Sequence, residues 1–435
     1  MFTRRKIGAM GHRCRSPPGQ LRYHDEHVPT TPTLTTDPSG ASDHRSALLA
    51  GYLGWTLDAF DFFLVVMCLT AIGREFHKSD QEMALATVLT LAFRPVGAFF
   101  FGLLADRYGR RLPLMLDLIF YSVVEVASGL APNFTTFLIL RALFGVGMGG
   151  EWGVGASLAM EKVPRRLRGL LSGFLQQGYA TGYLLAAVCY FLLYERVGWR
   201  PLFFIGGLPA LLALFVRVRV KESEVWKKTR RESWGELWRE ILSHWQRFLY
   251  IALLMMAMNF AAHGTQDMYP TFLERQWHFS VAERAGITAV SMIGAILGGT
   301  LCGWLSDRYG RRRSMVTALL LAVLAVPLWA FAPSIGLVVL GAFVLQFLVQ
   351  GAWGVIPAHL SELSPDSVRG FLPGFGYQCG VLLASSVSYI EAVFAHRTSY
   401  AIAMAGTAAT VFLMAAAVTA WGPERQAAHF GEAGP

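Results

Sequence analysis

The sequence predicts an all-α polytopic membrane protein with 12 transmembrane helices in two pseudo-symmetric six-helix bundles. Of its 435 residues, 54% are hydrophobic and 15% are charged, and the mean hydropathy is +0.42. Soluble domains carry about 25% charged residues, so this composition indicates a membrane protein. Apolar runs of about 20 residues, the length of a membrane-spanning helix, follow one another from residue 46 onward. Motifs of the first half recur in the second half at a constant distance of 201 residues.

The elements follow in this order. Residues 1–45 are polar and rich in Pro, Thr and Arg, which predicts a disordered cytoplasmic tail. The N-terminal bundle, 46–217, holds expected spans at 46–72, 82–104, 112–131, 134–158, 168–192 and 200–217. A charged, partly helical linker occupies 218–246. The C-terminal bundle, 247–421, holds expected spans at 247–270, 285–305, 314–332, 335–358, 369–392 and 399–421, before a short cytoplasmic tail at 422–435.

Basic residues predict the orientation. Lys and Arg crowd the amino tail and the loops after spans two, four, six, eight and ten, and the other loops contain few. By the positive-inside rule, both termini face the cytoplasm, and an even number of spans agrees with termini on the same side. Topology also explains the net charge of +9, and no basic patch with interleaved aromatics indicates nucleic acid. We expect a monomer in the plasma (inner) membrane whose partners are the lipid bilayer and a small organic anion.

Cysteines and glycines indicate packing rather than cofactor chemistry. No CxxC motif occurs, and of the five cysteines only Cys14 lies outside the apolar spans, whereas four lie in or beside them: Cys68, Cys189, Cys302 and Cys379. The run GVGMGG at 145–150 fits G-x-G-x-x-G, but it lies within a span and lacks the strand that a dinucleotide site needs. Small residues there allow helices to approach closely. We expect no metal and no cofactor, with protons as the coupling ion.

The internal repeat locates the binding site. GLLADRYGRR at 102–111 recurs as GWLSDRYGRR at 303–312. The stretch 149–169 matches the stretch that begins at Gln350, so that the same shift pairs Glu161 with Glu362. A gapless match over this distance indicates duplication. Two parallel repeats of six spans place the substrate site near the membrane midplane, between the halves.

These motifs resemble those of the major facilitator superfamily over about residues 46–421. The resemblance implies the major facilitator fold and a cytoplasmic latch made by the repeated loop. Asp106 and Asp307 would each pair with a neighbouring helix end and with an arginine, Arg110 or Arg311. The alternative interpretation is that these charges only set the topology.

Ionisable residues inside the expected spans are functional candidates, because membranes penalise charge. Span one contains Asp58 and Asp61, which share a helix face at i and i+3. Span four contains Arg141 and Glu151, about 15 Å apart along roughly one side of the helix. Further candidates in the other spans are Arg94, Asp117, Glu125 and His359.

The densest polar patch is NFAAHGTQDMYPT at 259–271. Four of its side chains form one helical stripe, which should face the bundle interior or a water-filled cavity: Asn259, His263, Gln266 and Asp267. His263 and Asp267 lie one turn apart and make an acid–base pair. Gly264 and Pro270 should loosen the helix, as a moving gate requires. The alternative interpretation is that these polar side chains hydrogen-bond to a neighbouring helix and only fix the packing of the two helices.

This patch resembles span seven of fungal Jen-type lactate permeases, in the sialate:proton symporter group. Six residues match the pattern N-x-x-S/T-H-x-S/T-Q-D-x-x-x-T: Asn259, His263, Thr265, Gln266, Asp267 and Thr271. Ala262 departs from it. DAFDFF in span one and RALFGVGMGGEWGVG in span four also resemble this group and aromatic-acid:proton symporters. The resemblance implies that Asp58, Asp61, Arg141 and Glu151 belong to the binding and coupling set.

The expected function is therefore proton-coupled symport of small monocarboxylates of the lactate or pyruvate type. Arg141, with Arg94 second, would grip the carboxylate with its planar fork, and Asn259, Gln266 and His263 would hydrogen-bond the acid. The proton would travel on one of Asp267, Asp58, Asp61, Glu151 or His263. A symporter of aromatic or sialic acids and a transporter-like nutrient sensor remain alternatives, and no constellation of residues indicates an enzyme.

Overall fold

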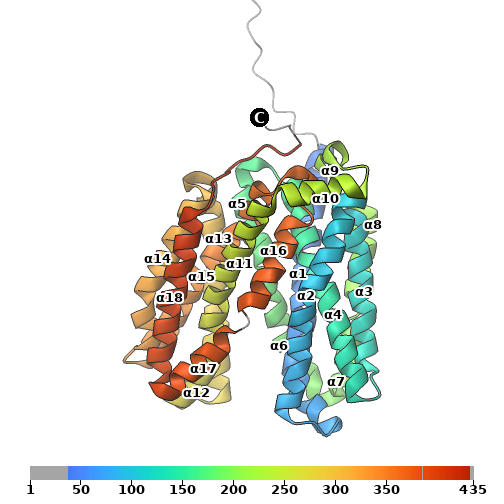
Figure 1. The fold of residues 1–435 in the computed structure, drawn as a ribbon. Coiled ribbons are helices and arrows are strands. Elements are labelled where there is room, and N and C mark those ends of the chain that lie inside the picture. Colours follow the sequence, from blue (N-terminus) through green and yellow to red (C-terminus); the bar gives the residue numbers. More distant parts are fainter. Residues whose placement is uncertain (1–37, 385, 432–435) are drawn as a thin grey trace, which may run out of the picture.

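The computed structural model describes residues 38–384 and 386–431, which form two helical bundles (Figure 1). The N-terminal bundle consists of α1 (Pro38–Glu75), α2 (Asp80–Tyr108), α3 (Arg111–Gly129), α4 (Phe134–Lys162), η1 (Arg165–Leu167), α5 (Arg168–Gln176), α6 (Gly178–Val197), α7 (Trp199–Ile205) and α8 (Pro209–Arg219). The C-terminal bundle consists of α11 (Trp245–Gln266), α12 (Tyr269–Trp277), α13 (Val281–Tyr309), α14 (Arg311–Ala330), α15 (Ile335–Leu363), η2 (Asp366–Val368), α16 (Leu372–Ala384), α17 (Val387–Arg397) and α18 (Tyr400–Trp421).

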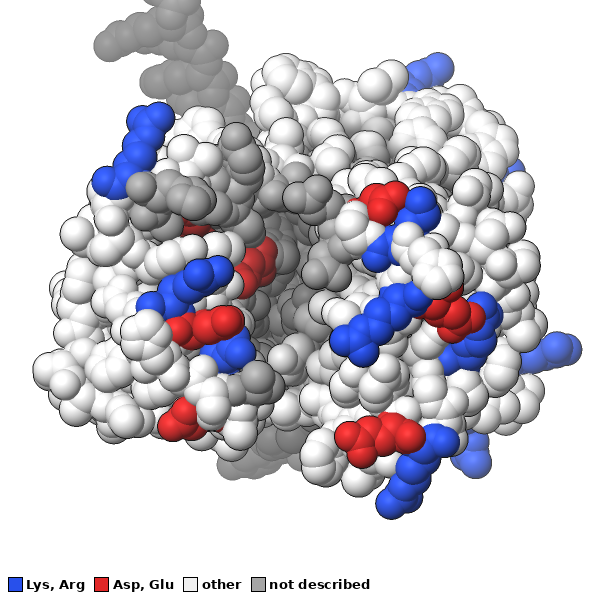
Figure 2. All heavy atoms as spheres, turned by 90° about the horizontal axis from the view of Figure 1, so that it is seen from below, with Lys and Arg blue, Asp and Glu red and all other residues white. Residues whose placement is uncertain are grey.

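The two ends of the molecule differ. Two short helices, α9 (Glu224–Thr229) and α10 (Trp234–Ser243), join the bundles on the side that also carries the segment after α18 (Figure 1, top). We call this side the linker face and the opposite side the open face. The bundles meet near the linker face and diverge toward the open face, which is hollowed between them (Figure 2). One helix of each bundle crosses to the other near the linker face, because α5 packs on α13 and α15, and α16 packs on α2 and α4.

The helices agree with ten of the twelve expected spans. Ten helical segments of the described chain are long and apolar enough to cross a membrane. The expected spans 168–192 and 369–392 are not among these ten and are divided between α5 and α6 and between α16 and α17. The expected spans 200–217 and 247–270 are among the ten, although each is interrupted, between α7 and α8 and between α11 and α12. Helix α1 begins at Pro38, within the segment 1–45 that the sequence predicted to be disordered. The rest of that predicted tail, 1–37, lies outside the described residues.

Glycines bring the helices of each bundle into backbone contact. A Cβ atom added to Gly97 in α2 would lie 1.6 Å from the carbonyl oxygen of Val146 in α4. The equivalent Gly298 in α13 would meet the carbonyl oxygen of Phe347 in α15 at 1.9 Å. Gly149, within the glycine-rich stretch of α4, approaches α2 in the same way. These contacts agree with the packing interpretation of GVGMGG and make each bundle a closely packed unit.

The repeated DRYGRR loops have the same conformation in both halves. Gly109 and Gly310 end α2 and α13 with φ of 104° and 99°, a region that glycine adopts readily because it has no Cβ. In each half, a glutamate from a distant part of the chain accepts hydrogen bonds from the first backbone amides of the helix that follows the loop. Glu222 accepts from Arg110 and Arg111 at 2.9 and 3.1 Å, and Glu424 performs this role at the start of α14. The sequence did not predict either glutamate.

Candidate functional site

A cavity of about 520 Å³ lies between the two bundles. Its walls come from both halves, with α1, α2, α5 and α6 on one side and α11 to α16 on the other. Most of the walls are apolar, and six of the lining residues are aromatic: Phe62, Phe63, Tyr179, Tyr183, Tyr269 and Trp329. The polar lining is concentrated on the C-terminal bundle. A cavity of this size, apolar with a few convergent polar groups, is typical of a small-molecule site.

Three of the four residues of the predicted polar stripe line this cavity. His263 Nδ1 lies 3.2 Å from both carboxylate oxygens of Asp267, and these side chains are 32% and 40% exposed. Gln266 donates a hydrogen bond to Gln346 Oε1 at 2.8 Å. Asn259 instead donates to the carbonyl oxygen of Met255 in its own helix at 2.7 Å and is 2% exposed. The structure therefore places Asn259 outside the cavity lining, with its amide used inside α11.

The helix that carries the stripe breaks where the sequence indicated. Helix α11 ends at Gln266 and α12 begins at Tyr269, with Pro270 in its first turn. Asp267 occupies the junction, where its backbone amide still donates to the carbonyl oxygen of His263. Proline is tolerated there because the first amides of a helix have no intrahelical partner. The acid–base pair thus lies at a potential hinge.

Arg94 of α2 lies at the interface between the bundles. Its guanidinium carbon is 5.9 Å from the centre of the Tyr377 ring on α16, and the residue is 4% exposed. Nε and Nη2 have no hydrogen-bond partner in the described part of the chain. Arg94 interacts electrostatically with Asp58 and Glu151 in its own bundle and with His263 in the other bundle. It is a buried cation with unused donors, and it lies behind the residues that line the cavity rather than among them.

Arg141, which the sequence predicted to grip the substrate, lies among helices of the N-terminal bundle. Its Nη2 donates to Glu125 Oε2 at 2.7 Å, and both side chains are nearly inaccessible. Three phenylalanine rings surround the guanidinium, the nearest with its centre at 4.7 Å. Arg141 does not line the cavity between the bundles. The pairing of a buried charge explains its position, because an unpaired guanidinium inside the bundle would be costly.

Three of the four acids predicted to carry protons lie inside the N-terminal bundle. Asp58, Asp61 and Glu151 are 0% exposed, and no oxygen of theirs has a hydrogen-bond partner among the described residues. Asp58 and Glu151 interact with Arg94, whereas Asp61 interacts with Glu125 and Arg141. None of the three lines the cavity. The structure therefore separates them from His263 and Asp267, which do.

Two residues of this region escaped the sequence analysis. Glu391 of α17 is 1% exposed, neither of its oxygens has a described hydrogen-bond partner, and it interacts electrostatically with Asp267. A carboxylate within the expected span 369–392 is the sequence signal that could have identified Glu391. Gln346 of α15 holds Gln266 and contacts Thr265 at 3.5 Å. Its role depends on a contact between helices, which no local pattern reveals.

On the linker face, the first repeated loop joins the two bundles. Asp106 Oδ1 and Oδ2 accept hydrogen bonds from the amides of Gly370 and Phe371, at 2.8 and 2.9 Å. Asp106 also pairs with Arg110, which contacts Glu161 at 3.1 Å. The aspartate belongs to the N-terminal bundle and its amide donors belong to the C-terminal bundle. This contact, which we call the first latch, therefore closes the linker face.

The second repeated loop makes the reciprocal contact, the second latch. Asp307 of the C-terminal bundle accepts from the amides of Gly169 and Leu170 in the N-terminal bundle, at 2.8 and 3.0 Å. Arg311 pairs with Asp307 at 2.8 Å and with Glu362 at 3.0 Å. Of the four predicted gating residues, Asp106 and Asp307 accept hydrogen bonds across the bundles and Arg110 donates to the carbonyl oxygen of Asp366. Arg311 pairs with acids of its own bundle.

The segment after α18 covers both latches. Glu362 accepts from the backbone amide of Ala427 at 3.2 Å, and Asp366 accepts from the amide of Gly431 at 2.5 Å. The Phe430 ring lies 3.7 Å from the guanidinium carbons of Arg168 and Arg369, one from each bundle. Residues 426–431 therefore bridge the bundles across the linker face, a role that the sequence did not predict for the tail.

Comparison with known proteins places the chain among transporters. It is 30% identical over 398 residues to a probable 4-methylmuconolactone transporter of Cupriavidus pinatubonensis, covering 88% of this chain and 90% of that one. It is 29% identical to the sialic acid transporter NanX of Escherichia coli, covering 77% and 84%. A carboxylic acid transporter protein homolog of Saccharomyces cerevisiae is 29% identical over 80% of this chain, which spans 61% of that relative's length.

The fold and a family profile agree with these relatives. A solved structure of the proton:xylose symporter XylE superposes with a TM-score of 0.73 at 19% identity, covering 90% of this chain and 98% of that one. The profile of the Major Facilitator Superfamily matches residues 51–274 and 268–434. These relatives are transporters rather than enzymes. The chain belongs to the Major Facilitator Superfamily.

Proposed function

We propose that this protein is a proton-coupled symporter of small monocarboxylates that works by alternating access. The observation that carries the proposal is the His263–Asp267 pair beside Gln266, on the wall of an apolar cavity between the bundles. An acid–base pair that faces a cavity can exchange a proton with it. Relatives named for carboxylic and sialic acids support an acidic substrate.

Within this proposal, Arg94 grips the substrate carboxylate, in place of Arg141. Arg94 is buried with unused donors, and a carboxylate oxygen would satisfy them, whereas Arg141 already has Glu125. The buried unsatisfied donors cost about 1–3 kcal/mol each, which favours binding of an anion. Gln266 and His263 hydrogen-bond the acid. Asp267 or His263 carries the proton, with Asp58, Asp61 and Glu151 as a second, buried set.

The direction of movement follows from the latches. With the linker face on the cytoplasmic side, as the basic loops indicate, the structure corresponds to an outward-open state. Protonation and substrate binding would let the latches break, and the halves would rock about the site. One proton with one monocarboxylate anion is electroneutral.

A second candidate is symport of aromatic or other larger acids. Six aromatic side chains on the cavity wall favour a flat, unsaturated substrate, and about 520 Å³ is within the range of drug-sized ligands. Competition by benzoate or sialate against lactate uptake ranks these substrates. A sensor that signals without flux would produce a growth phenotype but no uptake of any of these acids.

The test is uptake of labelled L-lactate and benzoate into proteoliposomes with an alkaline interior, with and without a proton-collapsing ionophore. Accumulation that disappears with the ionophore is expected. Asp267→Asn should abolish accumulation against a gradient, and Arg94→Gln should abolish binding, while Arg196→Gln, an exposed arginine at the end of α6, should leave both unchanged. Accumulation that survives the ionophore would refute proton coupling, and normal uptake by Arg94→Gln would refute the anion site.

A further inference from the structure

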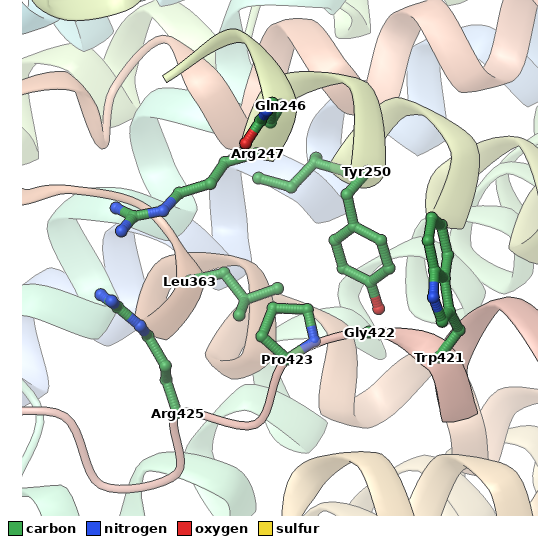
Figure 3. A pocket seen from close by; sticks show the side chains of 9 residues that line it. Gln246, Arg247, Tyr250, Leu363, Trp421, Gly422, Pro423 and Arg425 are labelled. Atoms are coloured by element: carbon green, nitrogen blue, oxygen red, sulfur yellow. The ribbon is translucent and has the colours of Figure 1, made fainter. Parts of the chain in front are cut away.

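A second pocket, of about 340 Å³, lies on the linker face, away from the cavity between the bundles. It is formed by the start of α11, the end of α15 and the segment that follows α18 (Figure 3). Because α11 and α18 both cross the membrane, the pocket lies at the level where the apolar spans end. It is thus accessible to the headgroup region of one leaflet.

Two arginines give the pocket its charge. Arg247 of α11 and Arg425 of the tail line it and are close enough to repel each other electrostatically. Figure 3 shows both guanidinium groups extended toward the same side of the pocket. Neither forms an ion pair with a carboxylate of the described chain, although Glu240 also attracts Arg247 electrostatically. Glu240 pairs with Arg231 at 2.9 Å, and Glu424 accepts from backbone amides at the start of α14.

Apart from Gln246, the remaining lining is apolar or aromatic. Ile251, Leu363 and Pro423 form part of it, and the Trp421 side chain beside them is 78% exposed. Tryptophan at the end of a span is typical of the membrane–water interface. The Tyr250 hydroxyl, directed toward Gly422 and Pro423 in Figure 3, has no hydrogen-bond partner among the described residues. The pocket therefore offers a cationic rim and an apolar floor, with the buried Tyr250 hydroxyl behind them.

We propose that this pocket binds the phosphate of an anionic phospholipid of the leaflet at the linker face. Two guanidinium groups suit a phosphate, whose oxygens accept bidentate hydrogen bonds. A free phosphate ion would satisfy the arginines but would leave the apolar floor unused, whereas the glycerol and the first methylenes of a lipid would cover it. If the linker face is cytoplasmic, as proposed above, anionic lipids are the ones available there. A headgroup held between α11 and the tail would also tie the tail to the C-terminal bundle.

The test uses the purified full-length chain in detergent, titrated with palmitoyl-oleoyl phosphatidylglycerol or phosphatidylcholine and followed by native mass spectrometry. Each basic residue near a charged lipid surface changes the affinity roughly fivefold. We therefore expect Arg247→Gln with Arg425→Gln to weaken phosphatidylglycerol binding about 25-fold, and Arg425→Gln alone about fivefold. The matched control is Arg313→Gln, an exposed arginine at the start of α14 on the same face, which should bind as the unmodified protein does.

Three results would overturn the proposal. One is equal affinity for the two lipids, and another is unchanged phosphatidylglycerol binding by the double variant. The third is displacement of phosphatidylglycerol by inorganic phosphate at similar concentration, which would assign the pocket to the free ion. Lactate uptake by the variants is measured in parallel, so that a failure of the transport proposal is recognised separately from a failure of lipid binding.

Discussion

Asp106→Asn should shift the protein from the open-face state toward a state that opens at the linker face. In the structure the Asp106 carboxylate accepts two inter-bundle amide hydrogen bonds, from Gly370 and Phe371. Hydrogen bonds to a charged acceptor contribute roughly 1.5–3 kcal/mol each, and neutral ones about 0.5–1.5 kcal/mol. An asparagine keeps one neutral bond. The net loss is therefore roughly 3 kcal/mol, a shift of about 150-fold in the equilibrium between the two states.

The distance between the halves on the linker face reports this shift. Arg166 and Arg313 are exposed there, one on each bundle, and accept spin labels after replacement by cysteine in a background without native cysteines. Double electron–electron resonance should show a longer distance in Asp106→Asn. The matched control is Glu75→Gln, which removes an ion pair with Arg200 inside one bundle at the open face.

Two results would refute this reasoning. The distance distribution could stay the same in Asp106→Asn and in its combination with Asp307→Asn, although both proteins are folded. Alternatively, Glu75→Gln could lengthen the distance as much as Asp106→Asn does. Either result would mean that the latches do not hold the linker face closed.

Three further substitutions test the packing and the tail. Arg141→Ala should lower the stability of the folded protein by about 3–5 kcal/mol, because Glu125 stays buried without its cation, and an unchanged melting temperature would contradict this. Gly149→Ala should reduce yield and melting temperature, since its Cβ would lie 1.9 Å from a main-chain oxygen of α2, whereas Gly336→Ala, with nothing within 4 Å, should not. Phe430→Ala should remove about 1–2 kcal/mol of cation–π stabilisation and lengthen the spin-label distance, and an unchanged distance would exclude the tail from the closure.

The duplication made much of the fold and of the linker face predictable. A gapless shift of 201 residues carries Asp106 onto Asp307 and Arg110 onto Arg311, so that any role of one loop is expected of the other. The shift does not reveal which groups of the opposite bundle donate hydrogen bonds to the two aspartates. The amides of Gly169 and Gly370 have no side-chain signature, and they meet the aspartates only because α5 and α16 each pack on the opposite bundle.

The cavity was predictable in part. The spacing of His263, Gln266 and Asp267 placed them on one face, and all three line the cavity. Asn259 shares that stripe, but its amide is taken up by a carbonyl oxygen of the preceding turn. Periodicity shows which residues share a face of a helix. It does not show whether a polar side chain on that face instead hydrogen-bonds to a backbone carbonyl of its own helix.

The position of Arg141 could not be read from the sequence for a similar reason. Glu125 was a recognised candidate in span three, yet its contact with Arg141 joins two different helices. A charged residue in a span is equally consistent with a substrate site and with an internal ion pair. The choice between them depends on which helices are neighbours and how they are rotated, which is a property of the packed bundle.

The tail that lies across the linker face has a consequence for protein engineering. Residues 426–431 reach from the end of α18 over both bundles, with the Phe430 ring held between an arginine of each. A fluorescent reporter or purification tag fused at the carboxyl end would disturb the contacts of this segment with both bundles. The transport rate of the fusion protein would then differ from that of the unfused chain. Fusions at the amino end avoid residues 426–431. A fusion at the carboxyl end needs a flexible spacer before its transport rates are compared with those of the unfused chain.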